Sequence, residues 1–387
     1  MITNSQFELS MYMRDNKEFT EIDKVYKSFT IYEEMHNYIY IGELRMRNDF
    51  GIFKEYPIIS GEEITIKIKI ANDDIEKELI FLVFQTRVEG EDYIITLIPK
   101  WFLYLSKDKI TKGFENKIDK TISDILSESN VNSGKSKLES NENNDSPSPA
   151  SRKFMQLNRS GFGFIKYLSQ FATESNKSGY MNFFNKENKH NFKSFFKIKS
   201  DTGKNFETIS EAFIKNLRFE DKIISYQLDG GFSGKTYYWD WDNGEMKSYY
   251  YKITDSKFSL NDSAGINTKY MEADNEEKVS ILMQTAPIGE DLYWDELYSQ
   301  APLQNSVFRK NVFNIYAIFD IFGNWGYTPG IVVEALFESS KEISRNEFYS
   351  GKWIIYSANH IFDREAYITN LRLGLPFYNE IKSSDYE

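Results

Sequence analysis

The 387-residue chain contains no cysteine and only three histidines. Without cysteine it has no disulfides, no thiolate zinc ligands and no cysteine nucleophile. His36, His190 and His360 are far apart, and none has the i, i+4 partner that a metal-binding helix shows. His360 falls in a predicted strand and is interpreted as structural. We therefore expect no metal site.

Long apolar runs and an excess of positive charge are also missing. No run approaches the ~20 residues that span a bilayer, and residues 1–5 do not start a signal peptide, so we expect synthesis in a cytoplasm and no membrane partner. The net charge of −11 argues against sequence-specific DNA binding. A hydrophobic content of 41% and an aromatic content of 16% indicate a folded protein with room for two or more domains.

Residues 28–105 have the pattern of a β-sheet. Apolar residues alternate in 38–49 and again in 64–70, on either side of a loop that ends in the Pro-Ile-Ile-Ser-Gly-Glu-Glu turn of 57–63. The alternation changes phase near Gly42, which predicts a β-bulge there that would help the sheet to curl. Strands at 79–84 and 93–98 are predicted to form a hairpin through 89–92.

The middle of the chain mixes both periods. Ile118, Ile122, Ile125 and Leu126 predict an amphipathic helix over 112–126, and apolar residues between 164 and 172 predict a second one. The Ser-, Asn- and Pro-rich residues 127–152 are interpreted as a flexible insert, whose deletion we expect to leave folding intact. Strands are expected in 180–200, and a short helix near 210–217.

The remainder is predicted to be mostly β. A β region at 222–260 precedes a helical stretch at 293–311 that we expect to be interrupted at Pro302. The last block has strands at 313–321, 331–337, 352–362 and 366–373, with turns at 323–330 and 363–365.

Two glycine motifs resemble nucleotide-binding loops. The run 230–236 (Gly-Gly-Phe-Ser-Gly-Lys-Thr) has Asp229 where a phosphate-binding loop needs glycine, and no helix follows to hold the anion, so a hairpin turn is favoured. Gly161 and Gly163 give only the front of a dinucleotide-binding fingerprint, without a clear preceding strand or a third glycine.

The run 239–245 (Trp-Asp-Trp-Asp-Asn-Gly-Glu) places carboxylates beside tryptophans, as glycosidase clefts do. Asp240, Asp242 and Glu245 could also bind calcium, although the twelve-residue loop spacing is missing. A strand that ends in an Asp-Asn-Gly turn explains the run better. The basic and aromatic run 193–199 is interpreted as a solvent-facing strand. No catalytic, cofactor-binding or metal-binding residue is assigned.

Three stretches together resemble the central baseplate hub protein of contractile-tailed, T-even-type bacteriophages. The first runs from Ile41 to Ile64 and includes the turn of 57–63. The second joins the turn of 323–330 (Gly-Asn-Trp-Gly-Tyr-Thr-Pro-Gly) to 348–355. The third comprises 360–362 and 367–371. The resemblance covers about 30–105 and 310–375, and the insert at 127–152 is not part of the family pattern.

The resemblance implies a mainly β (α+β) protein with two tube-like antiparallel β-barrels flanking a mixed α/β middle region. We expect a first barrel domain at 1–111, a helical and mixed insert at 112–221, a second mixed region at 222–309 that partly completes the first barrel, and a second barrel domain at 310–387.

For function, the resemblance implies a non-enzymatic structural protein of the virion tail baseplate. It would form a homotrimeric ring of pseudo-sixfold symmetry that joins a threefold spike, which in some members carries a lysozyme domain, to the sixfold tail tube. Other baseplate proteins would surround it, and DNA would pass through without specific binding. Two alternatives stay open: a carbohydrate- or receptor-binding β protein of a phage tail that uses Trp239 and Trp241, and the hub of a phage-derived injection system.

Overall fold

A computed structural model describes the chain in 17 separate stretches. They are residues 7–13, 17–18, 26–47, 58–70, 75–133, 138–140, 152–174, 177–195, 207–210, 213–222, 233–240, 243–252, 280–283, 296–313, 315–339, 344–345 and 349–375. Structural statements below concern these residues.

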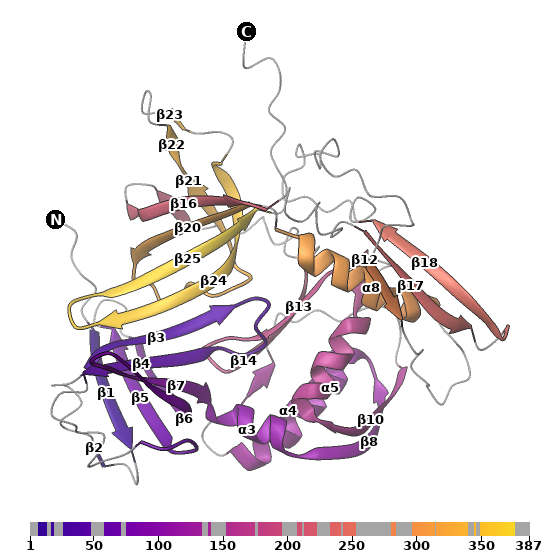
Figure 1. Ribbon diagram of the computed structural model, residues 1–387, viewed down its shortest axis with the longest axis horizontal. Helices are drawn as coiled ribbons and strands as arrows, with labels where there is room; N and C mark the ends of the chain where they lie inside the picture. Colours follow the sequence, from indigo (N-terminus) through magenta and orange to yellow (C-terminus); the bar gives the residue numbers. More distant parts are fainter. Residues whose placement is uncertain are drawn as a thin grey trace.

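One large sheet contains strands from both ends of the chain (Figure 1). Its order is β16 (Lys215–Asp221), β20 (Ile315–Phe322), β25 (Tyr367–Leu375), β24 (Gly351–Asp363), β3 (Tyr26–Glu34), β4 (Ile41–Arg47), β7 (Asp92–Pro99), β6 (Ile75–Glu89), β5 (Glu63–Ile70), β1 (Phe7–Met13) and β2 (Lys17–Glu18). A branch adds β21 (Val332–Leu336) beside β24, and β15 (Thr208–Ser210) beside β21. The predicted β-rich α+β fold is confirmed.

The two terminal blocks meet where β3 pairs with β24. Their antiparallel ladder runs from Ser357 opposite Glu34 to Asp363 opposite Ser28. We call this ladder the seam. Because it is made of backbone hydrogen bonds, the terminal blocks belong to one sheet among the described residues. The division of the chain at 111, 221 and 309 stays a prediction.

The N-terminal half of the sheet follows the predicted alternation. In β5, Ile64, Ile66, Ile68 and Ile70 are buried, while the residues between them point outward. The turn before β5 is confirmed for 58–63: Gly61 has φ +93° and its N–H donates to the Val83 carbonyl at 2.8 Å. Pro57 lies outside the described residues.

The bulge predicted at Gly42 is wrong. Gly42 keeps the regular ladder, opposite Ile31 on one side and Leu97 on the other. A Cβ at this position would lie 3.1 Å from Leu97 and 3.3 Å from the rings of Phe29 and Phe81. The glycine therefore admits large neighbours on the core face. Register shifts occur elsewhere, including in β6 between Val83 and Gln85.

Strands β6 and β7 form the predicted hairpin. Glu89 lies opposite Asp92, so Gly90 and Glu91 make a two-residue turn, and Gly90 has φ +61°. Positive φ at the first turn residue suits such hairpins.

Three helices pack beside the N-terminal half of the sheet: α3 (Lys100–Lys107), α4 (Ile118–Ser133) and α5 (Gly161–Leu168) (Figure 1). The sequence did not predict α3. Strand β8 (Lys109–Asn116) occupies the first part of the helix predicted at 112–126, and β10 (Arg152–Ser160) pairs with it. The buried faces of α4 and α5 are as predicted, and a 3-10 turn (Ser169–Phe171) follows α5.

The predicted insert at 127–152 is partly structured. Helix α4 continues to Ser133, Leu138 is buried, and β9 (Glu139–Ser140) pairs in parallel with β14 (Lys189–Ser194). Residues 134–137 and 141–151 lie outside the described residues. The prediction of flexibility is therefore wrong for the part that the structure describes.

The helix predicted at 210–217 is wrong at both ends, since β15 ends at Ser210 and β16 starts at Lys215. Between them Phe213 has 3-10 conformation, and residues 211–212 lie outside the described residues. Helix α8 (Glu296–Asn311) contains Pro302 without the predicted interruption. It packs on a separate sheet of β17 (Ser233–Asp240), β18 (Glu245–Lys252) and β19 (Ser280–Met283).

The predicted strands in 180–200 are β13 (Tyr180–Phe184) and β14. Four short strands complete the described elements: β11 (Thr173–Glu174), β12 (Lys177–Ser178), β22 (Glu338–Ser339) and β23 (Ser344–Arg345).

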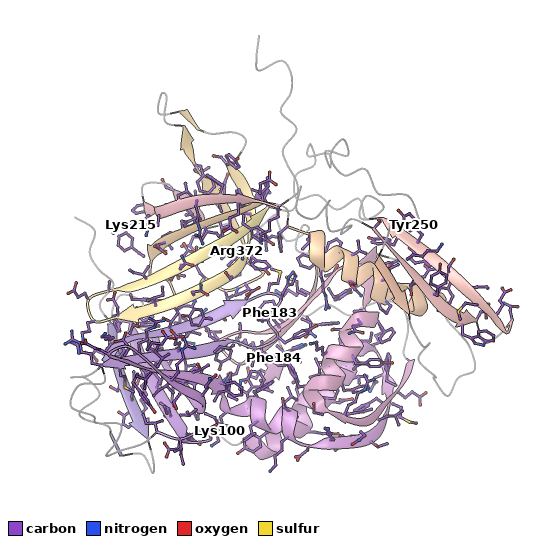
Figure 2. The ribbon with its side chains drawn as sticks, in the orientation of Figure 1. Lys100, Phe183, Phe184, Lys215, Tyr250 and Arg372 are labelled. Atoms are coloured by element: carbon purple, nitrogen blue, oxygen red, sulfur yellow. The ribbon has the colours of Figure 1, made fainter. Side chains whose placement is uncertain are left out.

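The main core cluster crosses the predicted boundaries. It combines Phe29 and Leu44 of the N-terminal sheet with Ile122 of α4, and with Phe362 and Tyr367 of the last two strands. Phe183 and Phe184 of β13 lie near the centre of the molecule (Figure 2). Among the described helices, none is long and apolar enough to cross a membrane.

Candidate functional site

Four segments converge on a cluster of polar side chains on the core side of the seam. Glu33 comes from β3, Lys186 from the turn between β13 and β14, Tyr327 from the loop 323–330, and His360 from β24. Glu33 and Lys186 are each 1% exposed and His360 is 0% exposed. We call these four residues the buried cluster.

Lys186 contacts Glu33 through two of its atoms. Its backbone N–H donates to Oε1 of Glu33 at 2.6 Å, and its Nζ donates to Oε2 at 2.9 Å. Nζ also donates to the Tyr327 carbonyl at 2.8 Å and lies 5.0 Å from the centre of the Trp325 ring. A buried charge needs such a set of partners to be tolerated.

His360 completes the cluster. Its Nε2 lies 3.1 Å from the Tyr327 carbonyl oxygen and 3.4 Å from Oε2 of Glu33, and its Nδ1 lies 2.7 Å from the Tyr367 hydroxyl. Because Nε2 faces two acceptors, we place the proton there, so that Nδ1 accepts from Tyr367.

The Lys186 charge acts on the pKa values of two neighbouring side chains, Glu33 and His360. Burial alone would raise the pKa of Glu33, but the charge of Lys186 and the hydrogen bonds from His360 and Lys186 outweigh it and hold that pKa below its usual value. Burial lowers the pKa of His360 to about 4, and the Lys186 charge adds to this effect. At neutral pH the cluster therefore holds a Lys–Glu ion pair beside a neutral histidine.

The cluster has no exposed side chain that could meet a substrate, so its chemistry is that of positioning. Sequence reasoning missed it. Glu33 carried a usable signal, because it has the same strand phase as the buried Phe29 and Ile31. Lys186, in a polar turn, carried none.

Of the other two histidines, His190 is fully buried and His36 is half-buried. His190 is 0% exposed, its Nε2 lies 2.7 Å from Oδ1 of Asn182, and burial lowers its pKa to about 3. His36 lies against the ring of Tyr356, and burial lowers its pKa to about 4, with a contribution from the charge of Arg309. No group of three or more His, Asp or Glu suited to a metal occurs in the described stretches.

The glycine motifs have structural roles where they are described. Gly234, Lys235 and Thr236 lie inside β17 between two partner strands, so the predicted hairpin turn is wrong for them, and 229–232 lie outside the described residues. Contrary to expectation, Gly161 directly follows a strand, β10. The Ser160 hydroxyl accepts from the Gly163 N–H at 3.1 Å, which caps α5.

Asp240 is a structural residue of the predicted hairpin. Its side chain is 0% exposed and accepts from Nδ2 of Asn243 at 2.6 Å and from Nζ of Lys247 at 2.5 Å. Trp239 is 39% exposed. Asp242 and Trp241 lie outside the described residues, as do 196–199 of the basic run, whose Phe195 is buried.

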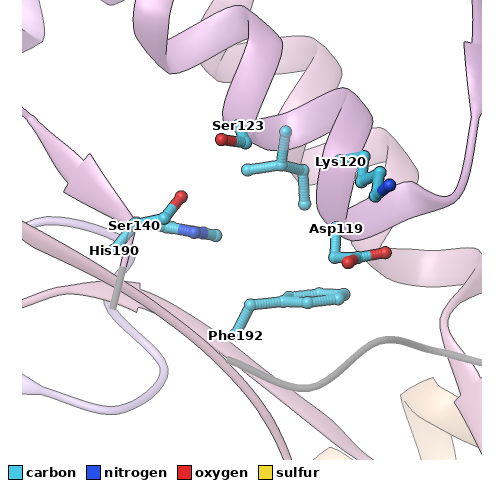
Figure 3. A pocket seen from close by; sticks show the side chains of 7 residues that line it. Asp119, Lys120, Ser123, Ser140, His190 and Phe192 are labelled. Carbon is cyan, nitrogen blue, oxygen red and sulfur yellow. The ribbon is translucent and has the colours of Figure 1, made fainter. Parts of the chain in front are cut away.

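A small cavity of about 200 Å³ lies between α4 and β14 (Figure 3). Asp119, Lys120 and Ser123 line it from the helix, and Ser140, His190 and Phe192 face them. The imidazole is the only buried ionisable group in this lining, and its low pKa keeps it uncharged at neutral pH. None of the candidate motifs in the sequence lies in this lining.

Comparison with known proteins shows the fold. No family model matches the chain, and no curated protein sequence matches it. Among solved structures it is similar to the 43 kDa tail protein of prophage MuSo2 from Shewanella oneidensis, with a TM-score of 0.58, 10% identity, and coverage of 96% of this chain and 99% of that one. It is also similar to the tail protein from Neisseria meningitidis MC58, with a TM-score of 0.54, 9% identity, and coverage of 95% and 96%. The chain thus has the fold of these phage-type tail proteins over nearly its whole length.

Proposed function

We propose that this protein is the central hub of a phage-type tail baseplate. The observation that carries the proposal is the fold likeness to two tail proteins, which extends over almost the full length of each compared chain. Because a fold can serve several functions, the role itself is inferred by analogy.

In this role, three copies form a ring in which the two terminal blocks of each subunit alternate. Such a ring has pseudo-sixfold symmetry and can join a threefold spike to a sixfold tail tube. The seam supports this arrangement, because it fixes the two blocks of one subunit relative to each other. The spike, the tail tube and other baseplate proteins are the proposed partners, and the baseplate of the virion is the proposed location.

The hub acts without enzymatic chemistry. The ionisable side chains of the buried cluster are enclosed and paired, as a structural role requires. The carbohydrate-binding alternative is not favoured, because Asp240 is buried and bonded within its own hairpin, whereas an acid–base role would need its carboxyl at a cleft.

Charge supports DNA passage through the ring. Three chains, each of net charge −11, together carry −33. Net negative charge repels phosphates, so DNA would pass without binding. A ring structure with a channel lined mainly by lysine and arginine would contradict this part of the proposal.

Light scattering on the purified full-length protein tests the assembly. The chain has a mass of 45.5 kDa, and we expect a particle of three times that mass that persists on dilution. Electron microscopy of the same sample should show a threefold ring with a pore. A monomer at every concentration tested would contradict the proposal.

A further inference from the structure

The turn between β13 and β14, residues 185–188, is held by contacts to several segments, among them those of Lys186 and Asn188. Lys186 ties it to Glu33 of β3 and to the Tyr327 carbonyl of the loop 323–330. Asn188 accepts hydrogen bonds from the Tyr40 hydroxyl at 2.6 Å and the Trp101 ring N–H at 2.8 Å. The Lys186 attachment contains ionisable groups of opposite charge, while the Asn188 attachment is neutral. An ion pair of 3.1 Å between Lys77 and Glu187 holds the turn as well.

The loop 323–330 is held on the same side of the seam. The Tyr327 carbonyl accepts from Lys186 and faces Nε2 of His360, and the Thr328 hydroxyl lies 3.4 Å from Oε1 of Glu33. Both covering segments therefore contact one enclosed group of ionisable side chains. Hydrogen bonds that do not titrate also hold the loop, from the Gly323 N–H to the Tyr367 carbonyl and from the Gly330 N–H to the Ile355 carbonyl.

A second proton on His360 would disturb this arrangement. The imidazolium would stand beside the Lys186 ammonium, with the single Glu33 carboxylate to neutralise both cations. Its new Nδ1–H would point at the Tyr367 hydroxyl, which donates to Nδ1 in the neutral form and would have to turn round. In a site closed to water, both changes disfavour the closed arrangement.

We propose that the buried cluster is an acid-sensitive latch: protonation of His360 in mildly acidic solution releases the loop 323–330 and the β13–β14 turn from the seam. The β3–β24 ladder remains, because its backbone hydrogen bonds do not titrate. The inference concerns the single chain and does not rest on the proposed hub function.

Other ionisable groups around the latch respond differently. Burial would raise the pKa of Glu187, but hydrogen bonding and charge from Lys77 outweigh burial and hold it below its usual value, so Glu187 titrates at lower pH than a free histidine. Burial, with Glu207 as a second cause, raises the pKa of Tyr327, which stays a neutral phenol in acid. Glu34 of β3 accepts from the Tyr356 hydroxyl at 2.7 Å.

The sign of the pH effect follows from linkage. The pKa of His360 is about 4 in the closed state, against an ordinary value of 6.5 when the ring is released. The open state binds more protons between these values, so closure weakens as the pH falls from 6.5 toward 4. Between pH 7.5 and pH 4.5 the opening equilibrium should rise on the order of 50-fold.

Hydrogen exchange on the full-length protein tests the latch. Protection factors, corrected for the intrinsic pH dependence of exchange, are measured at pH 7.5 and 4.5 for residues 184–190 and 323–330. We expect a loss of tens of fold in the wild type and less than about threefold in His360→Gln, because glutamine can donate to the Tyr327 carbonyl but takes up no proton. Protection of the β4–β7 ladder should stay constant.

His190→Gln is the matched control, because His190 is equally buried on the same hairpin but bonds to Asn182. This variant should lose protection as the wild type does. Three outcomes overturn the proposal: unchanged protection in wild type, equal loss in His360→Gln, or a loss abolished by His190→Gln.

A second measurement needs no change at position 360. With only three histidines, the ring carbon-13 signals of labelled wild-type protein can be assigned through the His36→Gln and His190→Gln variants. The titration midpoint of the His360 signal should coincide with the midpoint of loop opening. Midpoints more than one pH unit apart would overturn the latch even if His360→Gln failed to fold.

Discussion

Single residues in this protein show how strand phase decides burial. In β5 the isoleucines at even positions face the core, and the lysines between them face solvent. The same alternation places Glu33 on the core side of β3, where the ion pair with Lys186 and the hydrogen bonds from Lys186 and His360 make a carboxylate tolerable. The sequence pattern thus predicts the position of a residue, and its partners decide the energetics.

Replacement of Ile68 by aspartate should abolish folding, and Ile66→Asp should do the same. Both side chains are fully buried in the main core cluster, so an unpaired charge there destabilises by roughly several kcal/mol. Soluble expression and circular dichroism provide the measurement. Lys69→Asp, on the exposed face of the same strand, is the control and should fold. Normal soluble Ile68→Asp protein would count against the buried sheet face.

Glu33→Gln should lower the free energy of unfolding by about 3–5 kcal/mol, because it leaves the Lys186 charge buried without its counter-ion. Denaturant titration at pH 7.5 measures the change. A double variant with methionine at positions 33 and 186 should recover part of it. Glu8→Gln, at an exposed pair 4.0 Å from Lys69, should change stability by less than about 1 kcal/mol. Equal effects at the two sites would show that the buried pair is not special.

Secondary structure elements show where local signals were sufficient. The β6–β7 hairpin, β5, α5 and the final strands lie where alternation and turn residues predicted them. The helix predicted at 112–126 starts only at Ile118, because β8 pairs with β10 across a long sequence gap that periodicity does not reveal. Helix α8 keeps Pro302 in its interior, and its buried face packs on β17 and β18.

Gly42→Val should destabilise the protein by roughly 1–3 kcal/mol, as overpacking in a dense core does. The reason is the close approach of Leu97, Phe29 and Phe81 to the missing Cβ. Gly113→Val in β8 is the matched control, since nothing lies within 4 Å of its Cβ position. Thermal unfolding of both variants compares them. If Gly42→Val were as stable as Gly113→Val, the packing explanation for Gly42 would fail.

Deletion of 127–152 should now impair folding, in contrast to the expectation from composition. The deletion removes the end of α4, the buried Leu138, and β9, which pairs with β14. Replacement of 141–150 alone by a Gly-Ser linker of equal length spares these elements and should fold normally. Circular dichroism and melting temperature distinguish the two. A fully stable 127–152 deletion would show that α4 and β9 contribute little.

At the scale of the whole molecule, the two ends of the chain share a sheet and a core. The seam joins β3 to β24, and the main core cluster takes Trp325, Phe362 and Tyr367 from the C-terminal block. The two terminal blocks therefore stabilise each other. The hub proposal requires this, because one subunit must hold two blocks in fixed positions in the ring.

An N-terminal fragment of residues 1–111 should not fold on its own. It would expose one edge of β3 and lose the core residues supplied by the rest of the chain, and exposed edge strands promote aggregation. Co-expression with residues 112–387 should restore soluble material. A cooperative melting transition of the isolated fragment would instead show that the first predicted domain is autonomous.

By itself, the sequence determined the β-rich class, most strand positions, the buried faces of α4 and α5, and the Glu-Gly-Glu-Asp hairpin, because these follow from contacts between near neighbours. Only the tertiary structure decided that β3 pairs with β24, that Gly42 accommodates aromatic rings instead of a bulge, and that Glu33, Lys186 and His360 meet. The seam and the buried cluster join segments more than 150 residues apart in the chain, and the neighbours of Gly42 come from three separate strands. No local pattern encodes which distant strand or charge will be opposite.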